Sequence, residues 1–204
     1  MKERPILFNG AMVRAVLDGR KTQTRRVVKP QPTGNVVTLK ASDGLTFLHD
    51  YDGSSGNELK CPYGQPGDQL WVREAFDPIY PQDPKYNSGE PIAIDYRADN
   101  KRNRLCDQNG TRRWTPSIHM RRSASRILLE VTGVRAERLQ DIRDGDARAE
   151  GVDVRPGREY EYGASRTSFF LLWNSINGDG AHGWHANPWV WVLEFKRVTT
   201  ETKP

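Results

Sequence analysis

Lys21 and Thr24 lie in the segment GRKTQTRR (residues 19–26) and have the side-chain types needed for nucleophilic chemistry. A threonine hydroxyl is a weak nucleophile at neutral pH and needs a base nearby, and a lysine desolvated in a pocket can lose its proton and act as that base. The same segment could instead bind phosphate groups, because arginine side chains match phosphate geometry. Its arginines are Arg20, Arg25 and Arg26.

The elements around this segment must bring Lys21 and Thr24 together. Asn9 is a typical N-cap for a short helix, and Gly19 is a typical residue after the end of one. The sequence TQTRRVV then predicts a strand that Pro30 ends. Side chains alternate along a strand, so residues 21 and 24 of a regular strand would point to opposite faces. The chain must therefore still be turning at Lys21.

Strands are expected to outnumber helices in the rest of the chain. Alternating apolar residues predict strands in the segments LWVRE, ILLEV and PWVWVLEFKRV, with turns rather than crossover helices between the strands. This order predicts an α+β, mainly β fold, built as a small mixed or antiparallel barrel decorated by short helices. A doubly wound sheet is disfavoured.

Two short helices are expected in the last third of the chain. The acidic segment DIRDGDARAEGV predicts one, with Asp144 as a candidate N-cap and Gly151 as its stop. The second runs from about Ser168 to Ile176, and its apolar spacing predicts a buried face. That face comprises Phe169, Leu172, Trp173 and Ile176.

The charge of the chain favours an anionic partner. The formal net charge is +5, the isoelectric point is about 9.3, and 22 arginines stand against 9 lysines. The planar guanidinium suits phosphates and base edges better than an ammonium does, so this composition is typical of a nucleic-acid binder. A solvated surface in an arginine-rich protein would give the same composition, and both alternatives stay open.

The length of 204 residues fits a single domain, 1–204, with two long insertions. Residues 31–60 are rich in Gly, Ser, Asp and Asn and include a possible hairpin at Asp43-Gly44. Residues 77–115 are rich in Pro, Asn and Arg and begin the densest basic stretch, which could track a phosphate backbone or simply be a solvated surface. That stretch contains Arg97, Lys101, Arg102, Arg104, Arg112, Arg113, Arg121, Arg122 and Arg126, with Trp114 as a candidate ring for base stacking.

Membrane, secreted and metal-binding classes are disfavoured. No apolar run approaches the ~18–20 residues that cross a bilayer, and the apolar stretch in MKERPILFNG is too short for a secretory signal, so a cytoplasmic protein is expected. Cys61 and Cys106 form no CxxC pair and are expected to be reduced, and no metal or other cofactor is expected. The segment HGWH, residues 182–185, is expected to be a loop because further ligands are not nearby.

Four motifs, in order along the chain, resemble the ASCH domain: GRKTQTRR, QPGDQLWVRE, LEVTGVRAERLQDI with DARAEGV, and VWVLEFKRV. ASCH domains are similar to PUA domains, which are small β-barrels associated with RNA and modified nucleosides. The resemblance covers roughly half the chain and leaves both insertions outside the family core. The whole chain also resembles ASCH proteins of phages and prophages of proteobacteria. The resemblance implies a PUA-like barrel with short flanking helices.

The small bacterial ASCH amidohydrolases that act on N4-acetylcytidine carry a G-x-K-T-x-T-x-R motif. The resemblance places their catalytic lysine and threonine on Lys21 and Thr24, and their catalytic glutamate on Glu150 of DARAEGV. Glu150 would then orient Lys21 or pass a proton to the leaving amine. Ordinary structural roles are possible for each residue taken alone.

Three functions remain as alternatives. The leading hypothesis is an ASCH protein that binds RNA, DNA or a modified nucleoside in a pocket lined by Lys21, Thr24, Arg26 and Glu150. The second is a hydrolase that uses the same pocket, either an amidohydrolase on N4-acylated cytidine or a ribonuclease. The third is a phage accessory module that binds another protein. Nucleic-acid contacts are expected from Arg20, Arg25, Arg26, Arg112, Arg113, Trp114, Arg121 and Arg122.

Overall fold

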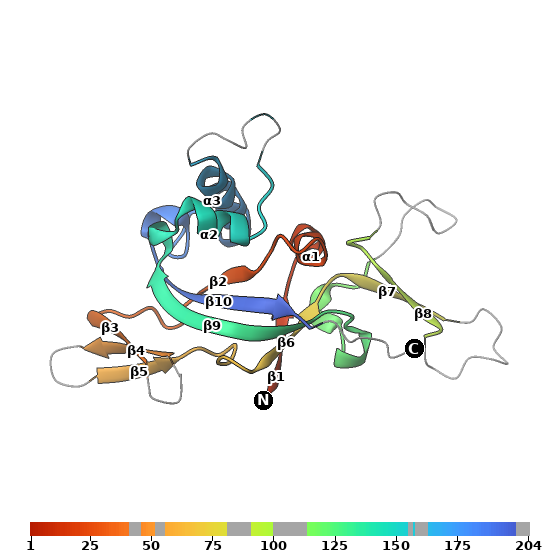
Figure 1. Ribbon diagram of the computed structural model, residues 1–204, viewed down its shortest axis with the longest axis horizontal. Helices are drawn as coiled ribbons and strands as arrows, with labels where there is room; N and C mark the ends of the chain where they lie inside the picture. The colour runs from red at the N-terminus through yellow and green to blue at the C-terminus, as the bar shows by residue number, and fades with distance from the viewer. Residues whose placement is uncertain are drawn as a thin grey trace.

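A curved five-stranded sheet forms the centre of the molecule (Figure 1). The computed structural model describes residues 1–40, 46–51, 56–80, 91–99, 114–154, 157 and 163–198. The strands of this sheet are β1 (Glu3–Leu7), β2 (Gln23–Val27), β6 (Gln69–Arg73), β9 (Leu128–Arg138) and β10 (Trp189–Arg197). Their order is β1-β6-β9-β10-β2, with β1 and β6 parallel and the other neighbours antiparallel.

Three α-helices pack against the sheet: α1 (Gly10–Leu17), α2 (Asp144–Ala149) and α3 (Ala164–Asn177). The helix expected after Asn9 is confirmed, because Oδ1 of Asn9 accepts a hydrogen bond from N of Met12 at 2.9 Å. Gly19 follows the helix with a φ of 74°, a conformation that favours glycine. Helix α3 begins earlier than the expected Ser168. None of the described helices combines the length and apolar character needed to span a bilayer.

Two details of the later helices correct the sequence prediction. Arg143, not Asp144, is the N-cap of α2. Oδ1 of Asp144 accepts hydrogen bonds from N of Ser165 and N of Arg166, both at 3.1 Å. These amides belong to the first turn of α3, where backbone amides have no hydrogen-bond acceptor within the helix. Ile176 is 53% exposed rather than buried, since it lies on the wall of a cavity.

The closing strand β10 is buried on both faces. Val190 and Val192 pack in an apolar cluster with α2 and α3, whereas Trp191, Leu193 and Phe195 pack in the larger cluster that includes α1. Alternation in the segment PWVWVLEFKRV predicted this strand, and the prediction is confirmed.

The first predicted insertion forms a three-stranded antiparallel sheet in the order β3-β4-β5, seen at the lower left of Figure 1. Its strands are β3 (Asn35–Lys40), β4 (Thr46–Tyr51) and β5 (Gly56–Lys60). The expected hairpin is confirmed by the pairing of Lys40 with Thr46, although its tip, 41–45, lies outside the described residues. Leu48 belongs to the larger apolar cluster, and Oγ1 of Thr46 donates to the carbonyl oxygen of Val134 at 2.9 Å. This segment is therefore part of the folded core.

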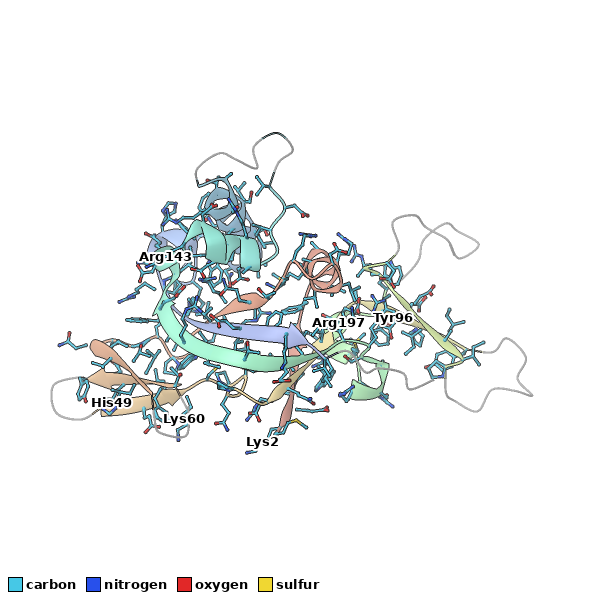
Figure 2. The ribbon with its side chains drawn as sticks, viewed as in Figure 1. Lys2, His49, Lys60, Tyr96, Arg143 and Arg197 are labelled. Carbon is cyan, nitrogen blue, oxygen red and sulfur yellow. The ribbon has the colours of Figure 1, made fainter. Side chains whose placement is uncertain are left out.

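The second predicted insertion contributes a small two-stranded sheet, β7 (Phe76–Ile79) with β8 (Ala93–Tyr96). Strand β8 confirms the strand expected in PIAIDYRA. The guanidinium of Arg126 joins this sheet to the main one, since it contacts Glu74 at 2.9 Å and also Asp99. It also lies 3.9 Å from the ring centroid of Tyr96 (Figure 2).

The fold is α+β and mainly β, with several sheets and few helices, as the sequence predicted. The expected closed barrel is not found among the described strands. Strands β1 and β2 are the two ends of the main sheet, and no ladder between described residues joins them. A side chain bridges the two ends instead, since Nη2 of Arg26 on β2 donates to the carbonyl oxygen of Leu7 on β1 at 2.8 Å.

Candidate functional site

The backbone turn that the sequence requires at Lys21 is present. The amides of Arg20 and Lys21 both donate to the carbonyl oxygen of Ala15 in α1, at 2.8 and 2.9 Å. Lys21 then forms an isolated antiparallel bridge with Glu150 before β2 begins. The turn therefore brings the end of α1 beside the end of α2.

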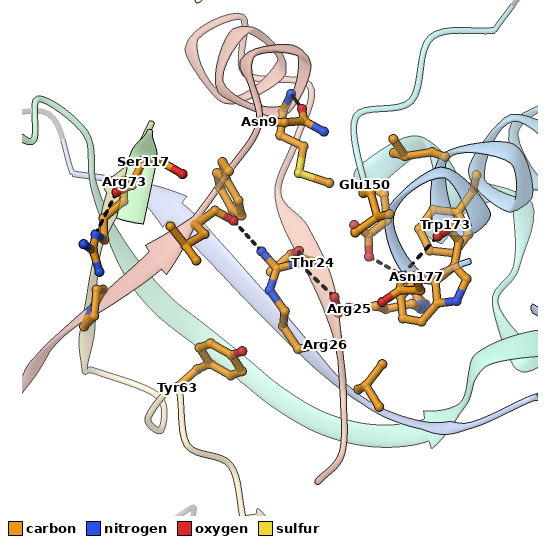
Figure 3. Close-up of a pocket in the computed structure, with 18 residues that line it drawn as sticks. Asn9, Thr24, Arg25, Arg26, Tyr63, Arg73, Ser117, Glu150, Trp173 and Asn177 are labelled. Atoms are coloured by element: carbon orange, nitrogen blue, oxygen red, sulfur yellow. Dashed lines mark hydrogen bonds and ion pairs between the residues drawn. The ribbon is translucent and has the colours of Figure 1, made fainter. Parts of the chain in front are cut away.

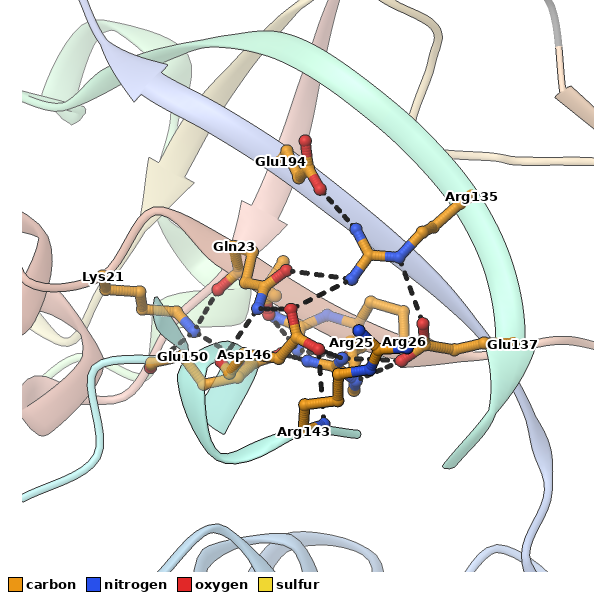
Figure 4. Close-up of polar contacts among 11 residues, drawn as sticks. Lys21, Gln23, Arg25, Arg26, Arg135, Glu137, Arg143, Asp146, Glu150 and Glu194 are labelled. Atoms are coloured by element: carbon orange, nitrogen blue, oxygen red, sulfur yellow. Dashed lines mark hydrogen bonds and ion pairs between the residues drawn. The ribbon is translucent and has the colours of Figure 1, made fainter. Parts of the chain in front are cut away.

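Lys21 and Glu150 form a buried ion pair (Figure 4). Nζ of Lys21 lies 2.8 Å from Oε2 of Glu150, and it also donates to the carbonyl oxygens of Glu150 and Gln23 at 2.9 and 2.8 Å. The Lys21 side chain has no exposed surface, and that of Glu150 is 3% exposed. An ammonium has three protons, so each proton has an acceptor here. Lys21 thus holds the Glu150 carboxylate in a fixed orientation.

Burial lowers the pKa of Lys21, because the ammonium loses its hydration. The negative charge of Glu150 and its hydrogen bond raise this pKa, while the charges of Arg26 and Arg25 lower it, and the net direction is downward. Lys21 therefore gives up its proton more readily than a lysine in water.

Arg25 is the second cation on Glu150 and is also buried. Its Nη1 lies 3.1 Å from Oε1 of Glu150, and its Nη2 lies 2.6 Å from Oε1 of Glu137 and 3.8 Å from Oδ2 of Asp146. Three carboxylates therefore surround one guanidinium without exposed surface. Arg25 thus holds Glu150 in place through a buried ion pair. Its expected contact with nucleic acid stays a prediction.

The ion pairs continue from Arg25 toward the surface along β9 (Figure 4). Arg135 contacts Glu137 at 3.1 Å, Asp146 at 3.3 Å and also Glu194. Nε2 of Gln23 donates to the carbonyl oxygen of Asp146 at 2.8 Å. Strand β2 is thus tied to α2 and β9 by polar side chains, which fixes the position of Glu150.

Thr24 and Arg26 lie on the same face of β2, and their side chains are in contact (Figure 3). Nη1 of Arg26 donates to Oγ1 of Thr24 at 3.2 Å. Thr24 has no exposed surface, whereas Arg26 is half-buried. The guanidinium therefore covers the hydroxyl, which a substrate could reach only after Arg26 moves.

A cavity of about 440 Å³ lies between the edge strands β1 and β2 and is bounded by α3 (Figure 3). Thr24, Arg26 and Glu150 line it, as the sequence predicted. Lys21 was expected to line it as well but is not a wall residue, and its ammonium contacts Glu150 instead. Aromatic rings form much of the remaining wall: Phe8, Tyr63, Phe169 and Trp173.

Several wall residues were missed by the sequence prediction. Phe169 and Trp173 were expected to be core residues, and they are also wall residues. Tyr63 and Arg73 were not singled out at all. Nε of Arg73 donates to the carbonyl oxygen of Ser117 at 3.1 Å. An arginine beside an alternating apolar run is typical of the solvent face of a strand, so no sequence signal could have identified it.

Among the described residues predicted to bind nucleic acid, four are not wall residues of the cavity: Arg20, Trp114, Arg121 and Arg122. Arg20 is exposed and pairs with Asp153 at 2.9 Å, and Arg122 is exposed and pairs with Glu3 at 2.6 Å. Arg121 is exposed and has no ion pair within the described part of the chain. Trp114 is half-buried and makes contacts, and Arg112 and Arg113 lie outside the described residues. Their expected contacts with nucleic acid remain predictions.

Within the described ranges, no group of three or more His, Cys, Asp and Glu side chains is placed to hold a metal ion. Burial raises the pKa of the Cys61 thiol to about 11, so this thiol is a poor nucleophile at neutral pH. Comparison with known protein families, curated proteins and solved structures gives no match for this chain in any of the three.

Proposed function

We propose that the protein is an ASCH, PUA-like domain that binds a nucleoside, free or within RNA, in the cavity between β1, β2 and α3. The observation that carries this proposal is a fixed carboxylate, Glu150, on the wall of a cavity lined by aromatic rings. Ligand pockets have volumes of about 300–1,000 Å³ and combine apolar walls with a few oriented polar groups, and this cavity fits both criteria.

Glu150 supplies the hydrogen-bond acceptor of the proposed site. Each of its oxygens contacts one cation: Oε2 contacts Lys21, and Oε1 contacts Arg25. A carboxylate has about four lone-pair sites that can accept hydrogen bonds. Acceptor capacity therefore remains for an N–H group on the edge of a base. The rings of Phe169 and Trp173 add faces on which a base can stack.

Hydrolysis is the second candidate function, and the lowered pKa of Lys21 favours it. In an amidohydrolase reaction, water would add to the acyl carbonyl of an N4-acylated cytidine, the amide C–N bond would break, and cytidine and a carboxylate would leave. Arg26 covers Thr24, and Lys21 has an acceptor for each of its protons. These contacts favour binding over turnover in the arrangement described.

Binding and turnover are separated by one experiment on two probes, cytidine and N4-acetylcytidine. Calorimetry measures affinity, and chromatography measures deacetylation. A binding protein without hydrolase activity binds at least one probe and leaves it intact. A hydrolase releases cytidine and acetate, and Thr24→Val, which keeps the side-chain shape, removes this turnover if the hydroxyl is the nucleophile. Lack of binding and of turnover for both probes, together with no binding of cytidine monophosphate or of a short single-stranded RNA, overturns the proposal.

A matched pair of variants tests the role of Glu150. Glu150→Gln keeps the shape but removes the charge and an acceptor, and we expect it to weaken binding of the probe about tenfold or more. Glu58→Gln removes a carboxylate at 45% exposure on β5, outside the cavity, and should leave affinity unchanged. Thermal melting of both variants shows whether they remain folded.

The ribonuclease and protein-binding alternatives are separated by labelled RNA. Cleavage of the RNA supports a ribonuclease. Affinity for RNA that falls steeply with salt supports phosphate contacts, whereas no measurable affinity for RNA leaves a protein partner as the better explanation of the basic surface.

A further inference from the structure

We propose that Arg26 and Arg73 form a phosphate subsite in the cavity, so that its ligand is a nucleotide, either free or as part of RNA, rather than a bare nucleoside. This inference rests on the proposed function, since it adds phosphate recognition to the same cavity.

The charge of the cavity wall is the first argument. Three arginines and one glutamate line it, which gives a formal charge of +2. One of the arginines, Arg25, is paired with Glu150 and Glu137. The excess positive charge therefore belongs to Arg26 and Arg73.

Arg26 contacts neutral acceptors. Its guanidinium donates to the hydroxyl of Thr24 and to the carbonyl oxygens of Arg25 and Leu7. No carboxylate within the described ranges forms an ion pair with it. Burial lowers the pKa of Arg26, because its charge is desolvated, while Tyr63 and the negative charge of Glu150 raise it, and the net direction is downward. A desolvated cation that has no ion pair with a described carboxylate is costly, and a bound phosphate would offset that cost.

Arg73 is likewise without a carboxylate partner in the described part of the chain. Its Nε donates to the carbonyl oxygen of Ser117, and its guanidinium carbon lies 5.5 Å from the ring centroid of Trp71, which holds the side chain in place. A guanidinium has five N–H donors in a planar fork that matches phosphate oxygens. Arg73 can therefore keep its bond to Ser117 and still bind a phosphate.

The two halves of the cavity have different chemistry. Figure 3 shows Arg73 and Ser117 on one side, Glu150 and Trp173 on the other, and Arg26 between them. The side with Glu150 offers an acceptor and aromatic faces for a base. The side with Arg73 offers a guanidinium that has no carboxylate partner among the described residues. A nucleotide has a base at one end and a phosphate at the other, which match these two sides of the cavity.

The test compares cytidine with cytidine 5′-monophosphate by calorimetry, using the full chain. We expect the phosphate to increase affinity about tenfold or more. Arg73→Gln and Arg26→Gln should each bring the ratio of the two affinities toward one. Arg73→Lys should retain part of the increase in affinity that the phosphate gives. Arg197→Gln, which changes an exposed arginine that does not line the cavity, should leave the ratio unchanged. Melting temperatures establish that each variant is folded.

A short single-stranded RNA distinguishes the two sources of phosphate. If the ligand is part of RNA, the RNA binds more tightly than the mononucleotide, and Arg73→Gln reduces the slope of log affinity against log salt by about one. If the ligand is a free nucleotide, the RNA binds no better. Equal affinity for cytidine and its monophosphate overturns this inference but leaves the proposed function in place. Failure of all three probes to bind overturns both.

Discussion

Lys21 and Glu150 are joined twice, by an ion pair of 2.8 Å between their side chains and by a bridge between their backbones. The two residues are 129 positions apart in the sequence, so the contact forms only when α2 closes onto the turn after α1. Because both side chains are buried, this contact connects the stability of the fold to the shape of the site.

Removal of one partner of this pair should strongly destabilise the protein. In Lys21→Met the carboxylate of Glu150 loses one of its two cations, and in Glu150→Gln the ammonium of Lys21 loses its anion. Breaking a buried pair typically costs about 3–5 kcal/mol, because an uncompensated charge stays in the interior. Urea denaturation of each variant measures the change in the free energy of unfolding, and the double variant should lose less than the sum of the single losses.

The surface pair Lys60 with Glu58 is the matched control, since its atoms lie 3.3 Å apart but both side chains are well exposed. Lys60→Met should change the free energy of unfolding by about 1 kcal/mol or less. Equal losses in Lys21→Met and Lys60→Met would show that the buried pair contributes no more to stability than a surface pair does.

Gly151→Ala should destabilise the contact between Lys21 and Glu150 by straining the backbone next to Glu150. Gly151 has a φ of 76°, and an added Cβ would lie 2.6 Å from Cβ of Ala15 and 2.8 Å from Cβ of Lys21. Strain in this region of backbone space costs about 1–3 kcal/mol, and the close contacts add to it. Gly145→Ala in α2, where an added Cβ meets nothing within 4 Å, should instead stabilise by about 0.5–1 kcal/mol. Thermal melting compares the two.

The sequence predicted the parts of the site that depend on local order. The segment GRKTQTRR predicted the turn at Lys21 and the strand that carries Thr24 and Arg26, because Gly19 and the alternation of a strand act over a few residues. Glu150 came from the resemblance to the ASCH domain, and the structure places it against Lys21.

The partners of Arg25 could not be predicted in this way. A charged residue in an alternating run is normally expected in solvent, and nothing near Arg25 in sequence shows that Glu137 and Asp146 surround it. Their contact depends on how β9 and α2 pack against β2. The open edges of the sheet were missed for the same reason, because strand propensity does not decide whether β1 meets β2.

Acid should reveal the contribution of Asp146 to stability. Burial raises the pKa of this carboxyl, but hydrogen bonds from Gln23 and Arg143 and the charges of Arg25 and Arg135 together lower it below 3.8. The unfolded chain then binds this proton at a higher pH than the folded chain does, so the free energy of unfolding falls as pH drops from about 3.8 through the folded pKa. Well above 3.8 the contribution is complete.

Asp146→Asn removes this titration, so its free energy of unfolding should fall less steeply with acid than that of the unchanged protein. Urea denaturation at a series of pH values measures both slopes. Parallel curves below pH 3.8 would show that Asp146 has the same pKa in the folded and unfolded chain.

Asp144→Ala should weaken α3 more than α2, because the Asp144 carboxylate accepts hydrogen bonds from the amides of Ser165 and Arg166. Within α2 it loses only the ion pair with Arg148 at 3.0 Å, in which the Arg148 side chain is 62% exposed and which therefore contributes little. Loss of such a cap costs about 0.5–2 kcal/mol. Since α3 carries Phe169 and Trp173, hydrogen exchange should speed up at its first turn, and nucleoside affinity should fall as the cavity wall loosens. Asp144→Asn keeps an acceptor oxygen and should retain most of the protection. Asp141→Ala, at an exposed carboxylate nearby, should change neither measurement. Faster exchange confined to α2 would refute the assignment of Asp144 as the cap of α3.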